Sequence, residues 1–531
     1  MDLETDCIPL VTSHSLNPLV KDYLLQKPGL NKFYSYSADS LGIRQAIQGR
    51  SAFPASRRKL ISDVIREQYS QAGLLDQKRS GLIDDLNNPN CFTITTGQQL
   101  GLLLGPLYTV IKISNAISLA LRAEADNPGK RIIPVFWMAS EDHDIEEINH
   151  FHYKHKKFVW NTSGSGPAGR LSTEGVLTLL KEAFGEQHNL PAMQDFADLC
   201  TVAYSKPTLA EATRFLTHHL FAETNLLILD ADHPALKREF SPVILRDITD
   251  ELSYKASRKA IDELSESYKI QVEGREINFF YMADGYRERI ERSSTGFSTV
   301  DRRFNWTADS LSDELSRHPE AFSPNVMMRP VYQEFILPNL AYIGGAAEVA
   351  YWLELKSVFE AHQVSYPVLI LRNSVMFLNR VNHHRFKNSG LRPDELLLPL
   401  HELEKANLLR HSNLDYNLTQ EKAELETWFE KLESTASQIQ PSLGTSARAM
   451  KQRFLHQTER FALKLIREAK KKERTGDYRV HEIYAHLHPN NSLQERVYCI
   501  PHFLEEYSFQ LLGDLTNHMI PEGKHMLIFK Y

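Results

Sequence analysis

The sequence predicts an α/β protein with a parallel-sheet core and a helical arm, and three patterns carry the prediction. Residues 91–96 and 132–139 are apolar runs of the kind that buried parallel strands show. Apolar side chains at helical spacing lie between them, so strand, helix and strand form a right-handed βαβ unit. Residues 225–229 and 367–371 repeat the strand pattern, and leucine or isoleucine recurs every seven positions from Leu418 to Ile439.

Composition narrows the functional classes. The chain has 531 residues, 42% of them hydrophobic, and a formal net charge of −6, which gives no basic footprint for nucleic acid or an anionic membrane. Four cysteines lack metal or disulfide spacing, no apolar run is long enough to span a membrane, and the N-terminus has no signal-like segment. We expect a cytoplasmic protein of several structural units, with small-molecule partners and neither nucleic acid nor membrane.

The first 90 residues are expected to form a helical lead. Residues 56–69 and 74–86 carry apolar side chains at helical spacing, and the Asn-Pro-Asn tract ending at Asn90 separates them from the first strand. No residue of this segment is predicted to do chemistry.

A glycine-rich segment follows the first strand. Its glycines let the backbone turn tightly and approach a ligand. A helix beginning at Pro106, a favoured first position, would direct free N–H groups at an anion, and Lys112 on the same face as Tyr108 would add a full positive charge. The residues predicted to bind substrate here are Gln98, Gln99, Gly105, Pro106, Tyr108 and Lys112.

An acidic segment follows the second strand. Glu141, Asp142 and Asp144 surround His143, and such crowding suits general acid/base chemistry or the binding of an amine. We predict these four residues to be catalytic and assign Asn149, a little further on, to substrate binding. Because the carboxyl ends of neighbouring parallel strands share one edge, this cluster and the glycine-rich segment should face one crevice. The alternative is a helix N-terminus beside a polar connecting loop.

A third polar stretch lies at 323–352. Arg329 and Gln333 surround an expected strand that reaches Leu337, and a glycine pair then precedes a helix. Such a passage can form the rim of a ligand pocket, although a packed strand-to-helix turn is the simpler alternative. The residues predicted to bind substrate here are Arg329, Gln333, Gly344, Gly345, Glu348 and Tyr351.

Other motifs are weaker. Residues 151–170 suggest a hairpin and loop, so the formal G-x-G-x-x-G match at 164–169 is interpreted as a loop, and the histidines from His143 to His155 as no metal site. Residues 173–222 are expected to be helical, and 273–290 to contain a hairpin. Asp232 is either a site residue or the N-cap of the next helix. His481, Glu482 and His486 miss the H-E-x-x-H spacing by one position, so no metal is predicted.

The predicted arm is an antiparallel helical hairpin. The repeat at sevens stops near Pro441 and Gly444, after which apolar residues resume at helical spacing to Leu465. A stripe left exposed on such an arm requires a partner.

Four strings resemble the cysteine-adding enzymes of bacillithiol biosynthesis, a family of cysteine ligases. They are TTGQQLGLLLGPLYTVIK, PVFWMASEDHDIEEINH, the segment 322–352 and PNNSLQERVY at 489–498, and together they extend the resemblance over essentially the whole chain. The resemblance implies a Rossmann-like core similar to class I nucleotidyltransferases, connecting-peptide insertions and a coiled coil that forms a homodimer. It also implies the addition of L-cysteine to the glucosamine nitrogen of glucosaminyl-malate, the last step of bacillithiol biosynthesis.

The resemblance and the patterns together give an expected organisation. It comprises a helical lead at 1–90, the first half of the core at 91–150, a connecting-peptide insertion at 151–210, the second half of the core at 211–380 with a further insertion near 273–320, a coiled-coil arm at 381–480 and a C-terminal helical segment at 481–531.

Amide formation from a free carboxylate needs activation, so ATP/ADP is the expected cofactor, as the resemblance also implies. The chain has no G-x-x-x-x-G-K-[ST] loop, and residues 95–101 and 141–144 depart from the two-histidine phosphate motif of adenylate-forming enzymes, so the nucleotide position is not identified. The alternatives are a Rossmann-like oxidoreductase, which would need a dinucleotide fingerprint at the first strand-to-helix turn, and a coiled-coil scaffold with a degenerate core.

Overall fold

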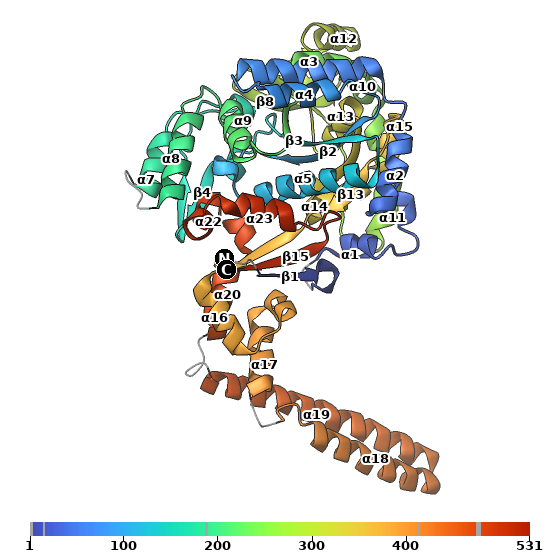
Figure 1. Cartoon of the computed structure of the whole chain (residues 1–531). Helices are drawn as coiled ribbons and strands as arrows, with labels where there is room; N and C mark the ends of the chain where they lie inside the picture. Colours follow the sequence, from blue (N-terminus) through green and yellow to red (C-terminus); the bar gives the residue numbers. More distant parts are fainter. Residues whose placement is uncertain (1–3, 14–15, 186–189, 412–414, 474–478) are drawn as a thin grey trace. The chain divides into compact units, whose positions relative to one another are not determined.

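The structure is a computed structural model that describes residues 4–13, 16–185, 190–411, 415–473 and 479–531 (Figure 1). The chain divides into two compact units. One consists of residues 7–376 with 492–527, and the other of residues 1–6, 377–491 and 528–531. Each unit is described by itself.

A five-stranded parallel sheet forms the centre of the larger unit. Its order is β13-β12-β2-β3-β6, with β2 at Cys91–Gln98, β3 at Arg131–Met138, β6 at Leu227–Asp230, β12 at Asn339–Gly344 and β13 at Val368–Leu371. All four neighbouring pairs are parallel, and β2 and β3 are joined through α5 (Tyr108–Asp126), so the predicted βαβ unit is confirmed. The chain builds outward from β2 in one direction and from β12 in the other. The topological switch point, where open α/β sheets bind ligands, therefore lies between β12 and β2.

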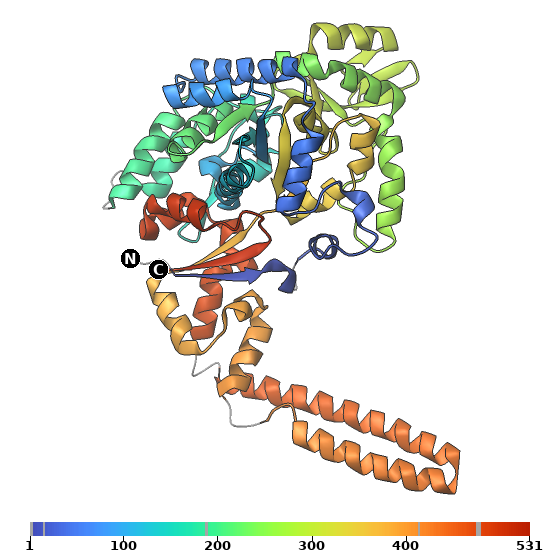
Figure 2. The same cartoon turned by 45° about the vertical axis from the view of Figure 1, so that its right-hand side comes forward.

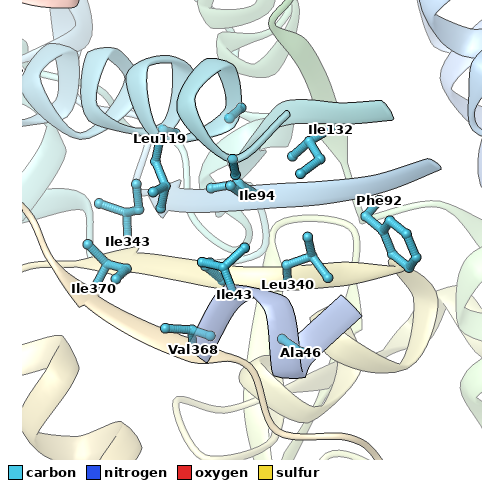
Figure 3. Packing of buried hydrophobic residues seen from close by; sticks show 14 of the residues in the cluster. Ile43, Ala46, Phe92, Ile94, Leu119, Ile132, Leu340, Ile343, Val368 and Ile370 are labelled. Carbon is cyan, nitrogen blue, oxygen red and sulfur yellow. The ribbon is translucent and has the colours of Figure 1, made fainter. Parts of the chain in front are cut away.

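Helices cover both faces of this sheet, because its strands are apolar on both sides. Figure 1 shows α3 (Ala55–Gln71) and α5 on opposite sides of the strands. On the α5 side, α2 (Ser40–Gly49) completes a tightly buried cluster (Figure 3) that includes Ile43, Ile94, Leu119, Ile343 and Ile370. Burial of such side chains is the main stabilising contribution to the core.

The first half of the chain contains several further strands and helices. They are β1 (Glu4–Pro9), α1 (Pro18–Leu24), α4 (Gln77–Asp85), α6 (Ile145–Ile148), the antiparallel hairpin β4 (His150–Tyr153) and β5 (Lys156–Val159), α7 (Val176–Phe184), α8 (Pro191–Ala203) and α9 (Leu209–Leu220). The predicted hairpin and helices after residue 150 are therefore present.

A second, antiparallel sheet lies between β6 and β12 in sequence. Its order is β10-β9-β8-β7-β11, with β7 at Phe279–Ala283, β8 at Tyr286–Ser293, β9 at Gly296–Thr299, β10 at Asn305–Trp306 and β11 at Phe322–Pro324. The helices around it are α10 (Pro234–Asp250), α11 (Leu252–Ser265) and α12 (Ala308–Arg317). The predicted hairpin is the β7–β8 pair.

Two local predictions are wrong, and one alternative that the sequence left open is decided. Arg329 and Gln333 lie on a helix, α13 (Met328–Ile336), whose first free N–H groups donate to the Asn325 side chain and whose residues are almost all buried. Pro106 precedes the first helical residue, Tyr108, by two positions, because a turn at 102–105 occupies the chain before it. Asp232 is not an N-cap, since His233 caps α10 and the Asp232 carboxylate binds Arg170 and Lys237.

The chain completes the larger unit with α14 (Ala346–Leu353), α15 (Lys356–Ala361), α21 (Gln494–Val497), α22 (Ile500–Tyr507) and α23 (Gln510–His518). A three-stranded sheet has the order β1-β15-β14, with β14 at Ser374–Leu378 and β15 at His525–Lys530. Within the described residues, no helix combines the length and the apolar character needed to cross a membrane.

The other unit is mainly helical and contains the arm. Its helices are α16 (Arg380–Ser389), α17 (Leu400–His411), α18 (Thr419–Ile439), α19 (Pro441–Glu473) and α20 (Arg479–Leu487). Figure 1 and Figure 2 both show α18 and α19 side by side as a hairpin, as predicted. Gly444 permits this close approach, because a Cβ there would lie 2.0 Å from Oγ of Ser437.

A buried ion pair holds α21 against the parallel sheet. Both terminal guanidinium nitrogens of Arg372, just after β13, donate to Glu495 at 2.7 and 3.0 Å, and the Val375 N–H donates to the same carboxylate at 2.8 Å. Neither side chain of the pair is more than 5% exposed.

We expect Glu495→Gln to destabilise the protein by about 3–5 kcal/mol, because it leaves the buried Arg372 cation uncompensated. Urea denaturation followed by tryptophan fluorescence measures this as a lower midpoint. Glu263→Gln removes a surface ion pair with Lys32 and should leave the midpoint nearly unchanged. Equal midpoints for both variants would contradict the prediction.

Candidate functional site

A cavity of about 680 Å³ opens at the carboxyl ends of four adjacent strands. Residues 97–99 follow β2, 139–143 follow β3, 345–348 follow β12, and Arg372 follows β13. Parallel strands end at one edge, so residues far apart in sequence meet there. The three predicted polar segments therefore share one hollow at the switch point.

Most of the predicted site residues line this cavity. They are Gln98, Gln99, Tyr108, Lys112, Glu141, Asp142, His143, Arg329, Gly345, Glu348 and Tyr351. Six do not line it: Gly105, Pro106, Asp144, Asn149, Gln333 and Gly344.

Two of these six are glycines that allow neighbouring atoms to pack closely against the backbone. A Cβ on Gly105 would lie 2.9 Å from Cβ of Cys499, and one on Gly344 would lie 3.0 Å from Cβ of Glu348. Both positions shape the chain around the site rather than facing a ligand.

The other four have structural surroundings of their own. Asp144 begins the short helix α6, and the Asn149 carbonyl accepts a hydrogen bond from the Trp160 N–H. Gln333 is buried behind the wall, where it accepts from Arg329 at 3.3 Å and donates to Glu334 at 2.9 Å. Pro106 lies in the turn before α5.

Lys112 joins two walls of the cavity. Its ammonium group donates to the Gly97 carbonyl at 2.5 Å, to Oε1 of Gln98 at 3.1 Å and to Oε2 of Glu348 at 2.7 Å. Burial lowers the pKa of Lys112, and the charge of the Glu348 carboxylate opposes that shift. The 2.7 Å contact between the ammonium group and the carboxylate is an ion pair. All three hydrogens of Lys112 are used within the protein, so its charge fixes Glu348 in place before any ligand arrives.

Glu348 receives further donors. The Tyr342 hydroxyl donates to its Oε1 at 2.5 Å, and the Gly345 N–H donates to its Oε2 at 2.8 Å, which caps the first turn of α14. Burial raises the pKa of Glu348, but the charge of Lys112, together with these donors, outweighs burial and holds the pKa below its ordinary value. The Glu348 carboxylate thus covers the N-terminus of α14.

The acidic loop is anchored from beneath. Glu141 forms an ion pair with Lys237, whose side chain is 1% exposed and which also contacts Asp232 at 3.1 Å. The Ser140 hydroxyl donates to Asp230, and burial next to Asp232 raises the pKa of Asp230 to about 6. Glu141 is therefore committed to a buried cation.

Asp142 is the more accessible of the two carboxylates of the loop that line the cavity. Nε2 of Gln99 donates to its Oδ2 at 2.7 Å, the His143 N–H donates to its Oδ1 at 2.8 Å, and its side chain is 37% exposed. The neutral amide of Gln99 orients this carboxylate without cancelling its charge. Asp142 can thus receive an amine or its proton.

His143 faces Arg287 from the antiparallel sheet. Nη1 of Arg287 lies 2.6 Å from Nδ1 of His143, and the imidazole also contacts the Phe280 ring. Burial first, and then the positive charge of Arg287, lower the pKa of His143. The imidazole is neutral at physiological pH.

Sequence analysis missed several basic residues of the cavity. Arg275, Arg287, Arg372 and Arg496 line it together with the predicted Lys112 and Arg329, opposite the carboxylates of Glu141, Asp142, Glu273 and Glu348. Of these four arginines, only Arg372 could have been predicted from the sequence, because it directly follows an apolar run that forms a buried strand. Arg275 and Arg496 have no side-chain hydrogen bond or ion pair to any residue that the structure describes, and both are exposed, so their guanidinium groups can receive an anion.

Within the described part of the chain, no group of three or more histidine, cysteine, aspartate or glutamate side chains could hold a metal ion. The site is a mixed-charge cavity with excess positive groups. It suits a ligand that has both anionic groups and an amine.

Comparison with known proteins identifies the family. Residues 3–373 match the family model described as "Bacillithiol biosynthesis BshC, N-terminal Rossmann-like domain", and residues 375–531 match "Bacillithiol biosynthesis BshC, C-terminal coiled-coil domain". Curated relatives named "Putative cysteine ligase BshC" include one from Flavobacterium johnsoniae, 37% identical over 98% of both chains. Another, from Christiangramia forsetii, is 34% identical over 100% of this chain and 99% of the relative, and one from Bacillus cereus (strain B4264) is 26% identical over 96% and 97%.

A crystal structure titled as a putative arginyl-tRNA synthetase from Campylobacter jejuni is 12% identical, covers 83% of this chain and 97% of that one, and has a TM-score of 0.23. A likeness this low carries no argument, so similarity of the core to class I nucleotidyltransferases stays a prediction. The Rossmann-like and coiled-coil parts of the prediction are confirmed. Since the two models match nearly all of the chain and relatives above 30% identity cover it from end to end, the chain belongs to the bacillithiol biosynthesis BshC family.

Proposed function

We propose that this protein is a cysteine ligase, which joins the carboxyl group of L-cysteine to the glucosamine nitrogen of glucosaminyl-malate. The names of its relatives support this activity. The observation that carries it is the cavity at the switch point, where a carboxylate that can receive an amine lies among several guanidinium groups. The product is a low-molecular-weight thiol, and we expect the reaction to take place in the cytoplasm.

The charges of the cavity match the proposed substrates. Glucosaminyl-malate has two carboxylates and an amine, and cysteine brings another carboxylate. Arg275 and Arg496 can bind such anions, because neither has an ion pair among the described residues. Asp142 would bind the ammonium group of the sugar and accept its proton, which leaves a nucleophilic amine.

ATP is the expected co-substrate, because a free carboxylate does not form an amide in water without activation. The excess of positive groups in the cavity supports binding of a phosphate chain. We assign no residue specifically to the nucleotide.

The arm supports a homodimer. Large apolar side chains remain exposed on α18 and α19, among them Trp428 at 57% and Phe461 at 55%. A hairpin that keeps such side chains in water gains stability by burying them against a second copy.

The activity is tested with purified protein, glucosaminyl-malate and cysteine, with and without ATP. Mass spectrometry should detect the cysteinyl amide only when ATP is present. The nucleotide product shows how the carboxylate is activated, since ADP indicates an acyl phosphate and AMP an acyl adenylate. Absence of the thiol product with every nucleotide would reject the proposal.

Asp142→Asn should lower kcat by about 10²–10⁴-fold, the usual contribution of a positioned acid or base. Asp144→Asn is the matched control, because Asp144 belongs to the same loop but lies outside the cavity. Steady-state kinetics should show near-normal turnover for the control. Equal losses in both variants would instead indicate that the loop as a whole, and not the Asp142 carboxylate, is required.

Trp428→Glu combined with Phe461→Glu should convert the dimer to a monomer of about 61 kDa, because each substitution puts a charge in the proposed interface. Size-exclusion chromatography with light scattering measures the mass. Thr427→Glu combined with Gln452→Glu adds the same charges at other exposed positions and should leave the dimer intact, because Gln452 lies on the opposite face of α19 from Phe461. A wild-type monomer would refute the proposed assembly.

A further inference from the structure

Arg287 is held rigidly by the antiparallel sheet. Its Nε donates to Oγ of Ser323 and its Nη2 to the Pro324 carbonyl, both at 3.2 Å, and its guanidinium carbon lies 3.9 Å from the centre of the Phe280 ring. These partners come together because β11 pairs with β7, and β7 pairs with β8, which carries Arg287. A hydrogen bond and a stacked ring on such a framework fix the plane and direction of the remaining donors.

The remaining terminal nitrogen, Nη1, lies 2.6 Å from Nδ1 of His143. A guanidinium group has only donors and stays protonated in proteins, so Nδ1 must be the acceptor. A neutral imidazole that accepts through Nδ1 carries its hydrogen on Nε2. No described residue accepts a hydrogen bond from Nε2, and His143 lines the cavity.

We propose that Arg287 is a positioning residue that holds His143 in the Nε2–H tautomer, so that this imidazole donates a hydrogen bond to a ligand in the cavity. His143 then cannot serve as the general base, because its only lone pair is occupied by Arg287. That role is left to Asp142, which has the accessible carboxylate. The tautomer follows from the contacts alone, whereas its part in catalysis rests on the proposed function.

The charge surroundings keep the imidazole neutral. Arg287 faces it from β8, while Glu288 on the same strand and Asp142 and Asp144 on its own loop oppose Arg287. Asp142 is the nearest of the acids, with Oδ1 at 3.8 Å from Nδ1. Burial and Arg287 together outweigh these acids, so the pKa of His143 lies below its usual range.

In amide formation, attack by the amine places negative charge on the carbonyl oxygen of the activated cysteine. An oriented N–H donor stabilises that charge more strongly than it stabilises the neutral carbonyl, which accelerates the reaction. Protonation of Nδ1 would aim a second positive charge at Arg287 and break the contact. Activity should therefore fall as the pH drops through the lowered pKa of His143.

The test is long-range ¹H–¹⁵N NMR on full-length protein with ¹⁵N-labelled histidine, across a pH titration. The chain has 22 histidines, so the His143 signals are assigned by their loss in His143→Gln. Wild-type protein should show Nε2–H for His143. In Arg287→Met its pKa should rise, the Nδ1–H tautomer should appear, and the acid limb of kcat should move to higher pH in parallel.

Arg292→Met is the matched control, because Arg292 lies on the same strand but binds Glu251 and the Thr249 carbonyl. It should leave the tautomer, the pKa of His143 and the pH profile unchanged, and circular dichroism should verify that both variants fold. An Nδ1–H signal in the wild type, or the same His143 titration in Arg287→Met as in the wild type, would overturn the inference. An Nε2–H signal in a protein without ligase activity would reject the proposed function and leave the positioning role of Arg287 intact.

Discussion

The buried ammonium group of Lys112 is the interaction on which the site depends. It reaches from α5 to the end of β2 and to Glu348 on α14, so it joins the two strands that flank the switch point. Burying a cation is costly unless every hydrogen finds an acceptor and a counter-charge is near. Lys112 meets both conditions, which is why one side chain can define the distance between the glycine-rich turn and the third polar segment.

The same principle operates beneath the acidic loop. Lys237 is as deeply buried as Lys112, and its counter-charges are Glu141 and Asp232. Two buried cations thus each fix one carboxylate of the cavity, Glu348 and Glu141, while Asp142 stays accessible. Adjacent acids in the sequence have different roles because only one of them reaches a buried partner.

Sequence reasoning reached the parallel sheet and the three polar segments, because both follow from local rules. Apolar runs such as that of β3 must be buried on both faces, and residues after parallel strands must share an edge. It failed where a distant side chain decides the outcome. Nothing around Arg287 indicates that the pairing of β7, β8 and β11 will direct it at His143. The dense apolar residues of α13 predict a strand, because the hydrogen bonds that Asn325 accepts from the first N–H groups carry little weight in a sequence pattern.

The structural elements that supply the charged side chains of the cavity suggest why this core carries insertions. The turns after the parallel strands supply most of the carboxylates, Glu141, Asp142 and Glu348, and the backbone that shapes the floor. Three of the cations that line the cavity come from elsewhere: Arg275 and Arg287 lie in the segment between β6 and β12, and Arg496 lies in α21. Glu141, Asp142 and Glu348 outnumber the two cations that the parallel core itself supplies, Lys112 and Arg372. Both cations are paired within the protein, so the core alone offers little positive charge to a carboxylate or a phosphate. The antiparallel sheet and the returning C-terminal segment reverse the balance, and because they are separate elements, they can set anion specificity without disturbing the buried pairs that hold the core.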